Sequence, residues 1–253
     1  MDDLPEMINL PLHAFSGISL GEMDQHKLMN RIDSKFVFHL NDLQEILTEV
    51  MEHYSVLEIE GKRKFQYESL YFDTAGYDLY KHHHNGKTNR IKVRFRRYLD
   101  TGAVYFELKK KSKGIRTDKY RIQQPEITTN LDLTQFNFLQ SHNVLQPELG
   151  SKMLIYYDRI TLVSKESMER VTLDMQMYFD NFTEKKEFPN LVIAEVKQDK
   201  FSRISPFVSA LRERNIREFK ISKYTLSIAL MTEGVKKNSF KQKINRIHKI
   251  NNN

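Results

Sequence analysis

The segment Arg90-Ile-Lys-Val-Arg-Phe-Arg-Arg-Tyr98 shows the pattern on which the interpretation of this sequence depends. Its cationic and apolar positions alternate, with Lys92, Arg94 and Arg96 set against Ile91, Val93 and Phe95. Successive side chains of a β-strand point to opposite faces of the sheet. The segment therefore predicts a strand with one cationic face and one apolar face.

The same alternation recurs in four further segments: Arg31–His39, Val104–Lys111, Arg170–Met177 and Leu191–Lys197. In the second of these, Glu107 and Lys109 share the charged face. In the third, the pattern places Met175 and Met177 together on the apolar face. Together, the segments predict several strands of a sheet that carries charge on one face.

Two architectures fit this alternation. One is an antiparallel sheet whose polar face is solvated and whose apolar face covers the core. The other is a closed barrel with a charged interior and helices outside, because interior and exterior positions also alternate along barrel strands. Arginine dominates the charged positions, and like charges two residues apart repel unless an anion neutralises them. The barrel explains these charges and the solvated sheet does not, but the alternation alone is more typical of a solvated sheet, so both architectures stay open.

Helix signals flank the strand-like segments. Ser19-Leu-Gly-Glu22 is typical of a capping box and predicts a short helix to about residue 30. Asn41 is the predicted cap of a second helix, whose apolar stripe runs from Leu43 to Tyr54. Further helices are expected near residues 132–141, after Ser205-Pro206 and near residues 222–231. The polar segment beyond residue 234 is expected to be flexible.

The positive charge of the chain is concentrated in two segments. The 253 residues carry 40 Lys and Arg against 33 Asp and Glu, a formal net charge of +7. Residues 81–121 hold 14 Lys and Arg and three acids, and residues 235–253 hold six Lys and Arg and no acid. Such concentration indicates an anionic partner: a nucleic acid, a membrane surface or a phosphorylated small molecule.

Composition excludes several kinds of site. The chain has no cysteine, which rules out disulfides, thiolate metal sites and cysteine nucleophiles and fits a cytoplasmic protein. No apolar run approaches the roughly 20 residues that span a bilayer. The acidic start lacks the apolar region of a signal peptide, so none is expected. A membrane-protein partner for the N-terminal helix and the basic tail stays open on charge alone.

Aromatic and histidine positions bear on the other partners. A nucleic-acid-binding module would place aromatic rings among the bases on the charged face. Phe95 and Phe106 fall on the opposite face, so we expect no nucleic-acid partner. Tyr71 and Phe72 are expected in the core. The run at residues 82–84 is His-His-His, which could bind a metal but is expected on a solvated loop.

Eight short motifs, taken in order, resemble one known superfamily. They are Tyr71-Phe-Asp-Thr74, Lys92-Val-Arg-Phe-Arg96, Glu107-Leu-Lys109, Lys119-Tyr-Arg121, Tyr157-Asp-Arg159, Arg170-Val-Thr-Leu-Asp174, Ala194-Glu-Val-Lys197 and Phe219-Lys-Ile-Ser-Lys-Tyr224. In these motifs the chain resembles the triphosphate tunnel metalloenzyme (CYTH-like) superfamily and, within it, the VTC-type polyphosphate polymerase domain.

The resemblance implies a fold and a set of site residues. The fold would be α+β, a closed antiparallel β-barrel with flanking helices, whose tunnel holds triphosphate or polyphosphate. The barrel would span residues 31–231, after an N-terminal helical segment (1–30) packed on it and before a flexible basic tail (232–253). The catalytic residues would be Arg94, Arg96, Lys109, Arg159, Arg170 and Lys223. Further phosphate-binding residues would be Lys35, Lys92, Lys119 and Lys220, with Lys220 and Lys223 on one side of a helix start, and Glu195 would bind Mn²⁺ or Mg²⁺.

One motif departs from the superfamily, whose Glu-x-Glu-x-Lys signature stands here as Arg31-Ile-Asp-Ser-Lys35. The missing acid favours a polymerase, which passes the terminal phosphate of ATP to a growing polyphosphate chain, over a two-metal hydrolase. A metal-dependent triphosphatase, in which Asp174 or Glu107 would position water, remains an alternative. So does a non-catalytic polyphosphate-binding module.

Overall fold

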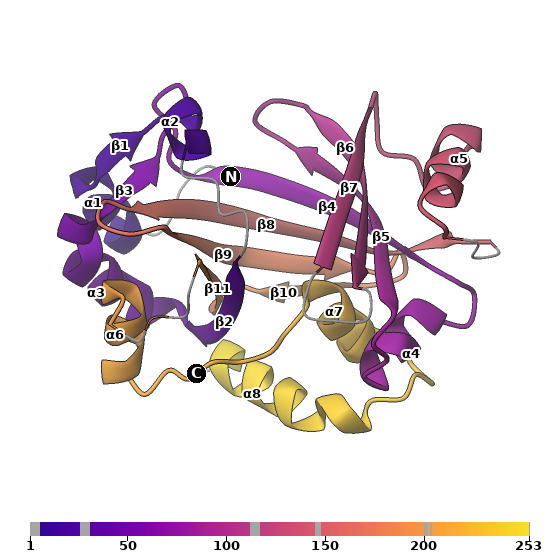
Figure 1. Cartoon of the computed structure of the whole chain (residues 1–253). Helices are drawn as coiled ribbons and strands as arrows, with labels where there is room; N and C mark the ends of the chain where they lie inside the picture. The colour runs from indigo at the N-terminus through magenta and orange to yellow at the C-terminus, as the bar shows by residue number, and fades with distance from the viewer. Residues whose placement is uncertain are drawn as a thin grey trace.

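A curled sheet forms the centre of the molecule, with helices on both faces (Figure 1). The computed structural model describes residues 6–25, 31–111, 117–144, 148–199, 202 and 204–252. These residues form an 11-stranded sheet with the hydrogen-bonded order β2-β11-β9-β8-β4-β5-β6-β7. The strands on this path are β2 (Ile32–His39), β4 (Phe65–Asp73), β5 (Arg90–Tyr98), β6 (Val104–Lys111), β7 (Thr117–Gln124), β8 (Gly150–Ser164), β9 (Glu169–Asp180) and β11 (Leu191–Gln198). All their pairings are antiparallel.

Three short strands extend the sheet at its sides. They are β1 (Ser16–Ile18), β3 (Tyr54–Leu57) and β10 (Lys185–Phe188). β3 pairs with β8 and carries β1 in parallel, while β10 pairs with β9. The helices are α1 (Glu6–Ala14), α2 (Leu20–Gln25), α3 (Leu40–Val50), η1 (Met51–His53), α4 (Asp78–His84), α5 (Leu133–Ser141), α6 (Pro206–Glu213), α7 (Lys223–Met231), η2 (Asn238–Phe240) and α8 (Lys241–Asn252).

The helix starts follow most of the capping signals in the sequence. The Oγ of Ser205 accepts a hydrogen bond from the Val208 amide, and Pro206 opens α6 as predicted. The Ser19 amide donates to Glu22, which confirms the capping box, although residues 26–30 of that predicted helix lie outside the described residues. Asn41 is not the cap of α3, because His39 holds that position and its Nδ1 accepts from the Asn41 amide.

The alternation in the sequence separates two faces of the sheet. On the outer face, Phe36 and Phe38 of β2 pack with α1, α3 and α6. Phe95 and Phe106 pack farther along the same face, with α5 beside them. On the inner face, Val37 and apolar residues of β8, β9 and β11 pack against α7 and α8. The rest of the inner face carries the charged residues. The apolar clusters on the two faces hold the sheet in a curve around these charged residues.

One predicted face assignment is wrong. Met175 packs in the outer cluster, but Met177 packs in the inner one. The register between β8 and β9 shifts between Tyr156 and Asp158, and Gln176 has a φ of 50°. This is a β-bulge, in which an extra residue reverses the alternation that follows it.

The predicted closed barrel is also wrong. The pairing path begins at β2 and ends at β7, and within the described residues these two strands do not pair with each other. The free edge of β2 is instead met by the segment before α7: Phe36 forms a bridge with Glu218, and the Phe219 amide donates to the Lys35 carbonyl. Alternation fixes which way side chains point, but it carries no information on whether the two outermost strands join.

The C-terminal segment is ordered, contrary to the predicted flexible tail. α8 runs beneath α7 in Figure 1 and buries Ile247 and Ile250 in the inner apolar cluster. The Tyr80 hydroxyl donates to the Lys236 carbonyl, which ties the segment to α4. Phe240 and Ile244 complete a helical apolar stripe that the many Lys and Asn residues of the segment had obscured. None of the helices in the described part of the chain is long and apolar enough to cross a membrane.

Candidate functional site

A cationic cavity of about 230 Å³ lies on the inner face of the curled sheet. Of the described residues, ten Lys and Arg side chains line it, against the carboxylates of Glu107 and Glu195. The cations come from six strands, from the residue before β2 and from the start of α7: Arg31, Lys35, Lys92, Arg94, Arg96, Lys109, Lys119, Arg159, Lys197 and Lys223. Positive charges from distant parts of the chain thus converge on one cavity, and such a concentration attracts anions.

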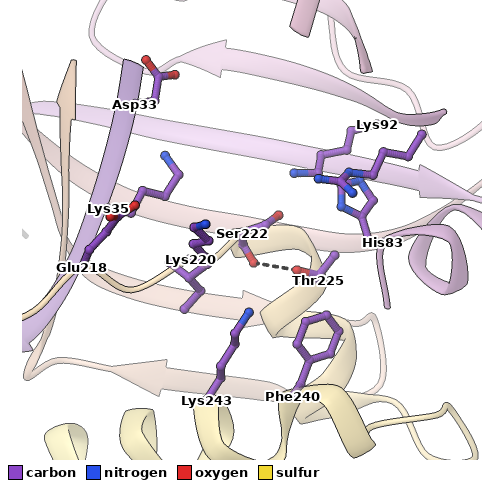
Figure 2. Close-up of a pocket in the computed structure, with 12 residues that line it drawn as sticks. Asp33, Lys35, His83, Lys92, Glu218, Lys220, Ser222, Thr225, Phe240 and Lys243 are labelled. Carbon is purple, nitrogen blue, oxygen red and sulfur yellow. Dashed lines mark hydrogen bonds between the residues drawn. The ribbon is translucent and has the colours of Figure 1, made fainter. Parts of the chain in front are cut away.

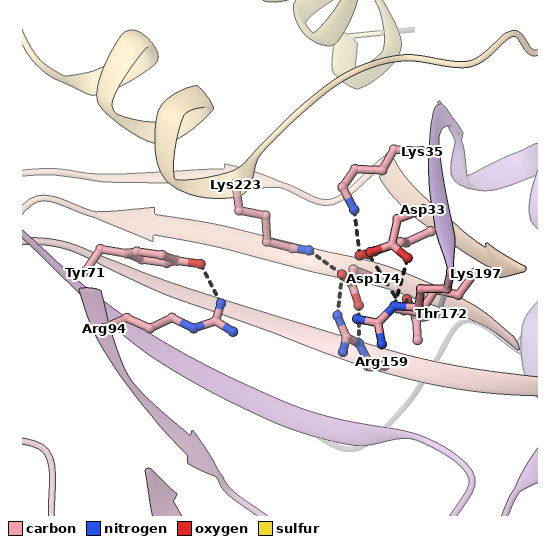
Figure 3. A network of polar contacts seen from close by, with 11 residues as sticks. Asp33, Lys35, Tyr71, Arg94, Arg159, Thr172, Asp174, Lys197 and Lys223 are labelled. Carbon is pink, nitrogen blue, oxygen red and sulfur yellow. Dashed lines mark hydrogen bonds and ion pairs between the residues drawn. The ribbon is translucent and has the colours of Figure 1, made fainter. Parts of the chain in front are cut away.

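Glu107 of β6 holds two of these cations in place. Its carboxylate accepts from Arg94 Nε at 2.8 Å and from Arg94 Nη2 at 2.6 Å, and Lys119 Nζ lies 2.5 Å from its other oxygen. Arg94 also donates to the Tyr71 hydroxyl at 2.7 Å (Figure 3). Burial would raise the pKa of Glu107, but the charges of Arg94, Arg96 and Lys119 outweigh it and hold that pKa far below its usual range. Glu107 thus remains a carboxylate that orients Arg94.

Asp174 of β9 has the same role on the opposite wall (Figure 3). It accepts from Arg159 Nε at 2.6 Å and from Arg159 Nη2 at 2.8 Å, and it forms an ion pair with Lys223. Burial raises the pKa of Asp174, but Arg159 and Lys223 together lower it well below its ordinary value. This network fixes the first residue of α7 to the sheet and turns its ammonium toward the cavity.

Glu195 of β11 is the third acidic group. It lies 2.7 Å from Lys35 Nζ and 3.8 Å from Lys197 Nζ. Lys197 also donates to the Thr172 hydroxyl at 3.3 Å. The charges of Lys197, Lys35 and Lys109 outweigh burial and keep the pKa of Glu195 well below its usual range.

Four lysines of the cavity have lowered pKa values: Lys92, Lys109, Lys119 and Lys197. Burial, followed by the charges of Lys35, Arg94 and Arg90, lowers the pKa of Lys92 to about 7. Burial lowers the pKa of Lys197 to about 8, although Glu195 opposes the shift. Burial and Arg94 also hold the pKa of Lys109 well below its usual range. A bound anion would supply the negative charge that this wall lacks and would return these ammonium groups to full protonation.

The structure brings together most of the residues predicted from the sequence. Nine of them line the cavity: Lys35, Lys92, Arg94, Arg96, Lys109, Lys119, Arg159, Glu195 and Lys223. Lys220 lies in an adjoining cavity, because it precedes α7 and does not share a helix face with Lys223 as predicted. Arg170 lies beyond the cavity on β9, where its Nη2 donates to the Met23 carbonyl at 3.0 Å.

The interpretation of the sequence missed several lining residues. Lys197 and Arg31 contribute cations, and Tyr71 and Tyr157 contribute hydroxyl groups. The Tyr157 hydroxyl is buried and has no hydrogen-bond partner within the described residues. Burial would raise its pKa, but Arg96 and Arg159 outweigh this and lower it. Tyr157 could have been found, because it lies two residues before Arg159 and so shares its face.

Aromatic rings therefore do lie among the cations on the charged face. The position of Phe95 and Phe106 on the opposite face is thus not sufficient to argue against a nucleic-acid partner. Arg159 lies over Tyr67 at 4.9 Å and Lys223 over Tyr157 at 4.4 Å from the ring centroids. Tyr67 and Tyr157 stack on each other at 5.2 Å, and Tyr71 stacks on Tyr224. Tyr71 and Tyr157 are buried, so these rings position arginines and lysines and have no face free for a base.

The histidine run lies in a helix and not on a solvated loop as expected. The side chain of His83 is largely buried beside Lys92 and Arg90, and burial lowers the pKa of His83 to about 2. His84 Nε2 accepts from the Ser239 amide at 3.3 Å, and the Ser239 hydroxyl donates to the His84 carbonyl. The run thus joins α4 to the C-terminal segment.

The acidic groups fit a metal ion only in a limited way. The described residues contain no group of three or more His, Asp or Glu that could enclose one. Glu107 and Asp174 each hold two cations at short range, and Glu195 also has two cationic neighbours. The contact of Glu195 with Lys197 is the loosest of these, at 3.8 Å, so Glu195 is the carboxylate most open to an ion. Mg²⁺ is commonly held by one or two carboxylates together with substrate phosphates. The site therefore suits an ion that arrives with phosphate, and not a cage made by the protein alone.

Comparisons with known proteins give a domain family and similar folds. A model of the VTC domain family matches residues 30–232. No curated protein matches the chain in sequence. A candidate adenylate cyclase from Bacillus halodurans is similar in structure over 81% of this chain and 98% of its own, with 12% identity and a TM-score of 0.50. A candidate adenylyl cyclase from Hippeastrum, described with a dominant triphosphatase activity, covers 77% of this chain and 94% of its own at 14% identity and a TM-score of 0.47.

Proposed function

Because the chain belongs to the VTC domain family, we propose that it is a polyphosphate polymerase, which transfers the terminal phosphate of ATP to the end of a polyphosphate chain. The observation that carries the proposal is the convergence of ten Lys and Arg on one cavity, against Glu107, Glu195 and, behind Arg159 and Lys223, Asp174. Such an excess of positive charge repels itself and requires a ligand that carries several negative charges close together. A phosphate chain meets this requirement, and its oxygens match the planar donor geometry of Arg94, Arg96 and Arg159.

In the proposed reaction, a terminal oxygen of the chain attacks the γ-phosphorus of ATP. A new P–O bond forms, the bond between the β- and γ-phosphates breaks, and ADP leaves with the electron pair of that bond. Phosphoryl transfer passes through a loose transition state whose charge spreads over the equatorial oxygens, so positioning and charge stabilisation dominate catalysis. Arg94, Arg159 and Lys223 suit this role, because Glu107 and Asp174 hold them in fixed positions that need no rearrangement during the reaction.

The state of the carboxylates favours transfer between phosphates over hydrolysis. Both carboxylates that could have activated a water molecule, Asp174 and Glu107, are engaged by cations, and their pKa values lie far below neutrality. A carboxylate with so low a pKa is a weak general base. A phosphate acceptor is already ionised at neutral pH and needs no base, which agrees with this arrangement.

A divalent ion is part of the proposal. Glu195 would hold Mn²⁺ or Mg²⁺ together with phosphate oxygens, and the ion would neutralise charge on the transferred group. The protein would contribute one carboxylate, that of Glu195, which Lys35 positions at 2.7 Å. Lys197 would move from Glu195 to a phosphate oxygen once the ion is bound.

The experiment is incubation of the purified protein with ATP and Mn²⁺, followed by electrophoresis of the products. We expect long phosphate chains and one ADP for each phosphate incorporated. Arg94→Ala, which removes a cavity cation, should lower chain synthesis about 100-fold to 1000-fold. Arg97→Ala provides a matched control on the same strand. Arg97 is on the alternate face and pairs with Glu68 at 3.2 Å.

Two other outcomes would replace the proposal. Release of free phosphate without chains would identify a triphosphatase. Tight binding of polyphosphate with no turnover of any nucleotide would identify a binding module. The second result would still support the cavity as a polyphosphate site, whereas the first would leave it as a site for triphosphate or nucleotides.

A further inference from the structure

A second cavity of about 330 Å³ adjoins the first (Figure 2). The two share four lining residues: Lys35, Lys92, Ile221 and Ser222. Beyond these, seven further charged or polar residues line the second cavity: Asp33, His83, Arg90, Glu218, Lys220, Thr225 and Lys243. The shared walls make the second cavity a continuation of the cationic surface, on the side of the molecule where α4 and α8 lie.

The C-terminal helix α8 and the short η2 before it build one wall of this second cavity. Phe240 and Lys243 line it, although both lie beyond residue 232, where the match to the family model ends. In Figure 2, the side chain of Lys243 rises from α8 toward Lys220 and Ser222. Ile247 and Ile250 anchor the helix in the inner apolar cluster, so Lys243 is presented from a fixed support.

Lys220 and Lys243 place two like charges against each other. Burial lowers the pKa of Lys243, and the charge of Lys220 lowers it further. Asp33 and Glu218 also line the cavity, and Asp33 is held by Arg31 at 2.9 Å. Two ammonium groups that face the same space repel each other unless an anion lies between them.

From this geometry, and resting on the function proposed above, we infer that the second cavity is a phosphate subsite formed with α8. It binds the part of a polyphosphate chain that has passed beyond the transfer site, between Lys220 and Lys243. A triphosphate fills the first cavity alone, whereas a long chain occupies both. The C-terminal helix therefore gives the protein its preference for long chains over triphosphate.

The test is direct binding of tripolyphosphate and of long-chain polyphosphate to the full chain, measured by calorimetry without ATP. For Lys243→Ala we expect about tenfold weaker binding of the long chain, as for loss of one charge-assisted contact, and unchanged binding of tripolyphosphate. Lys249→Ala is the matched control, because it removes an exposed lysine from the same helix. Lys243→Arg, which retains the charge, should bind as the wild type does.

Two results would overturn the inference: equal affinity of wild type and Lys243→Ala for the long chain, or equal weakening for both ligands. Unchanged thermal unfolding of Lys243→Ala would show that α8 stays docked. The binding assay needs no turnover. A wild-type protein that binds both ligands but makes no polyphosphate would therefore refute the proposed function and leave the phosphate subsite unaffected. A wild-type protein that binds neither would refute both.

Discussion

Arg159 donates two hydrogen bonds to Asp174, at 2.6 and 2.8 Å, so that a buried carboxylate on β9 orients a guanidinium on β8. Lys223 at the start of α7 binds the same carboxylate. The inner wall of the cavity thus consists of cations held by buried acids beneath them. A phosphate chain would meet the cations, while the acids fix where those cations lie.

Asp174→Asn tests this support directly. The amide keeps the shape of the side chain but leaves Arg159 and Lys223 without a countercharge in a buried setting. Removing one partner of a buried ion pair costs about 3–5 kcal/mol in the free energy of unfolding. Urea unfolding followed by circular dichroism should therefore show a lower midpoint. Added polyphosphate should restore part of the loss, because it supplies the missing charge, and an unchanged midpoint would contradict the role assigned to Asp174.

Arg94→Ala tests the opposite wall. Loss of a preorganised donor at the site of charge development typically lowers turnover about 100-fold to 1000-fold. We expect a drop of that size in chain synthesis, measured as ADP released per minute. Arg97→Ala should retain wild-type turnover, because Arg97 pairs with Glu68 away from the cavity. Equal losses in the two variants would show that β5 matters only for folding.

Glu195→Gln separates binding from turnover. The substitution removes the carboxylate that would hold the metal ion and frees Lys35 and Lys197, which it now binds. Polyphosphate should therefore bind at least as tightly as to the wild type, while turnover is lost at every Mn²⁺ concentration. Calorimetry and the ADP assay measure the two quantities separately. Retention of full turnover would exclude Glu195 as the metal ligand.

The lowered pKa values of the cavity lysines predict a pH dependence of binding. In the free protein, Lys92 loses its proton near pH 7 and Lys197 near pH 8. Tripolyphosphate affinity should therefore fall as the pH rises from 6 to 9, and binding at pH 8 should take up protons. Calorimetry in buffers of different ionisation enthalpy measures that uptake. Lys92→Met should take up fewer protons, and an uptake equal to that of the wild type would contradict the assignment.

The same shifts affect folding in the opposite direction. The unfolded chain holds these lysine protons up to a pKa near 10.5, so between pH 7 and pH 10 it binds more protons than the folded chain. The contribution of Lys92 and Lys197 to the free energy of unfolding therefore rises with pH over this window. As the pH rises, tripolyphosphate should therefore bind more weakly while this contribution to the free energy of unfolding increases. A loss of affinity at high pH can then be told apart from unfolding of the protein.

Ile247→Ala tests the docking of α8. Ile247 is fully buried in the inner apolar cluster, and truncation of such a residue costs about 2–5 kcal/mol. We expect a lower unfolding midpoint in urea. Lys249→Ala on the exposed side of the helix should have no effect. If Ile247→Ala left stability unchanged, the C-terminal helix would not belong to the folded core.

The sequence by itself determined the local features of this protein. Charged and apolar residues alternate in β5 and β6, and the structure places Arg94 and Arg96 inside and Phe95 and Phe106 outside, as the period of two requires. The start of α6 at Pro206 was equally fixed by local chemistry. These features depend on neighbours in the chain, so pattern alone could find them.

Only the tertiary structure decided how these pieces meet. The pairing of β2 with the segment at Glu218 in place of β7, the bulge at Gln176 and the docking of α8 each depend on contacts between residues far apart in the chain. The same holds for the site, where Asp174 binds Lys223 across 49 residues of sequence. Alternation aims a side chain at one face of a sheet. Which charges then share a cavity is set by the curvature of that sheet, and the curvature is fixed by apolar packing on both faces.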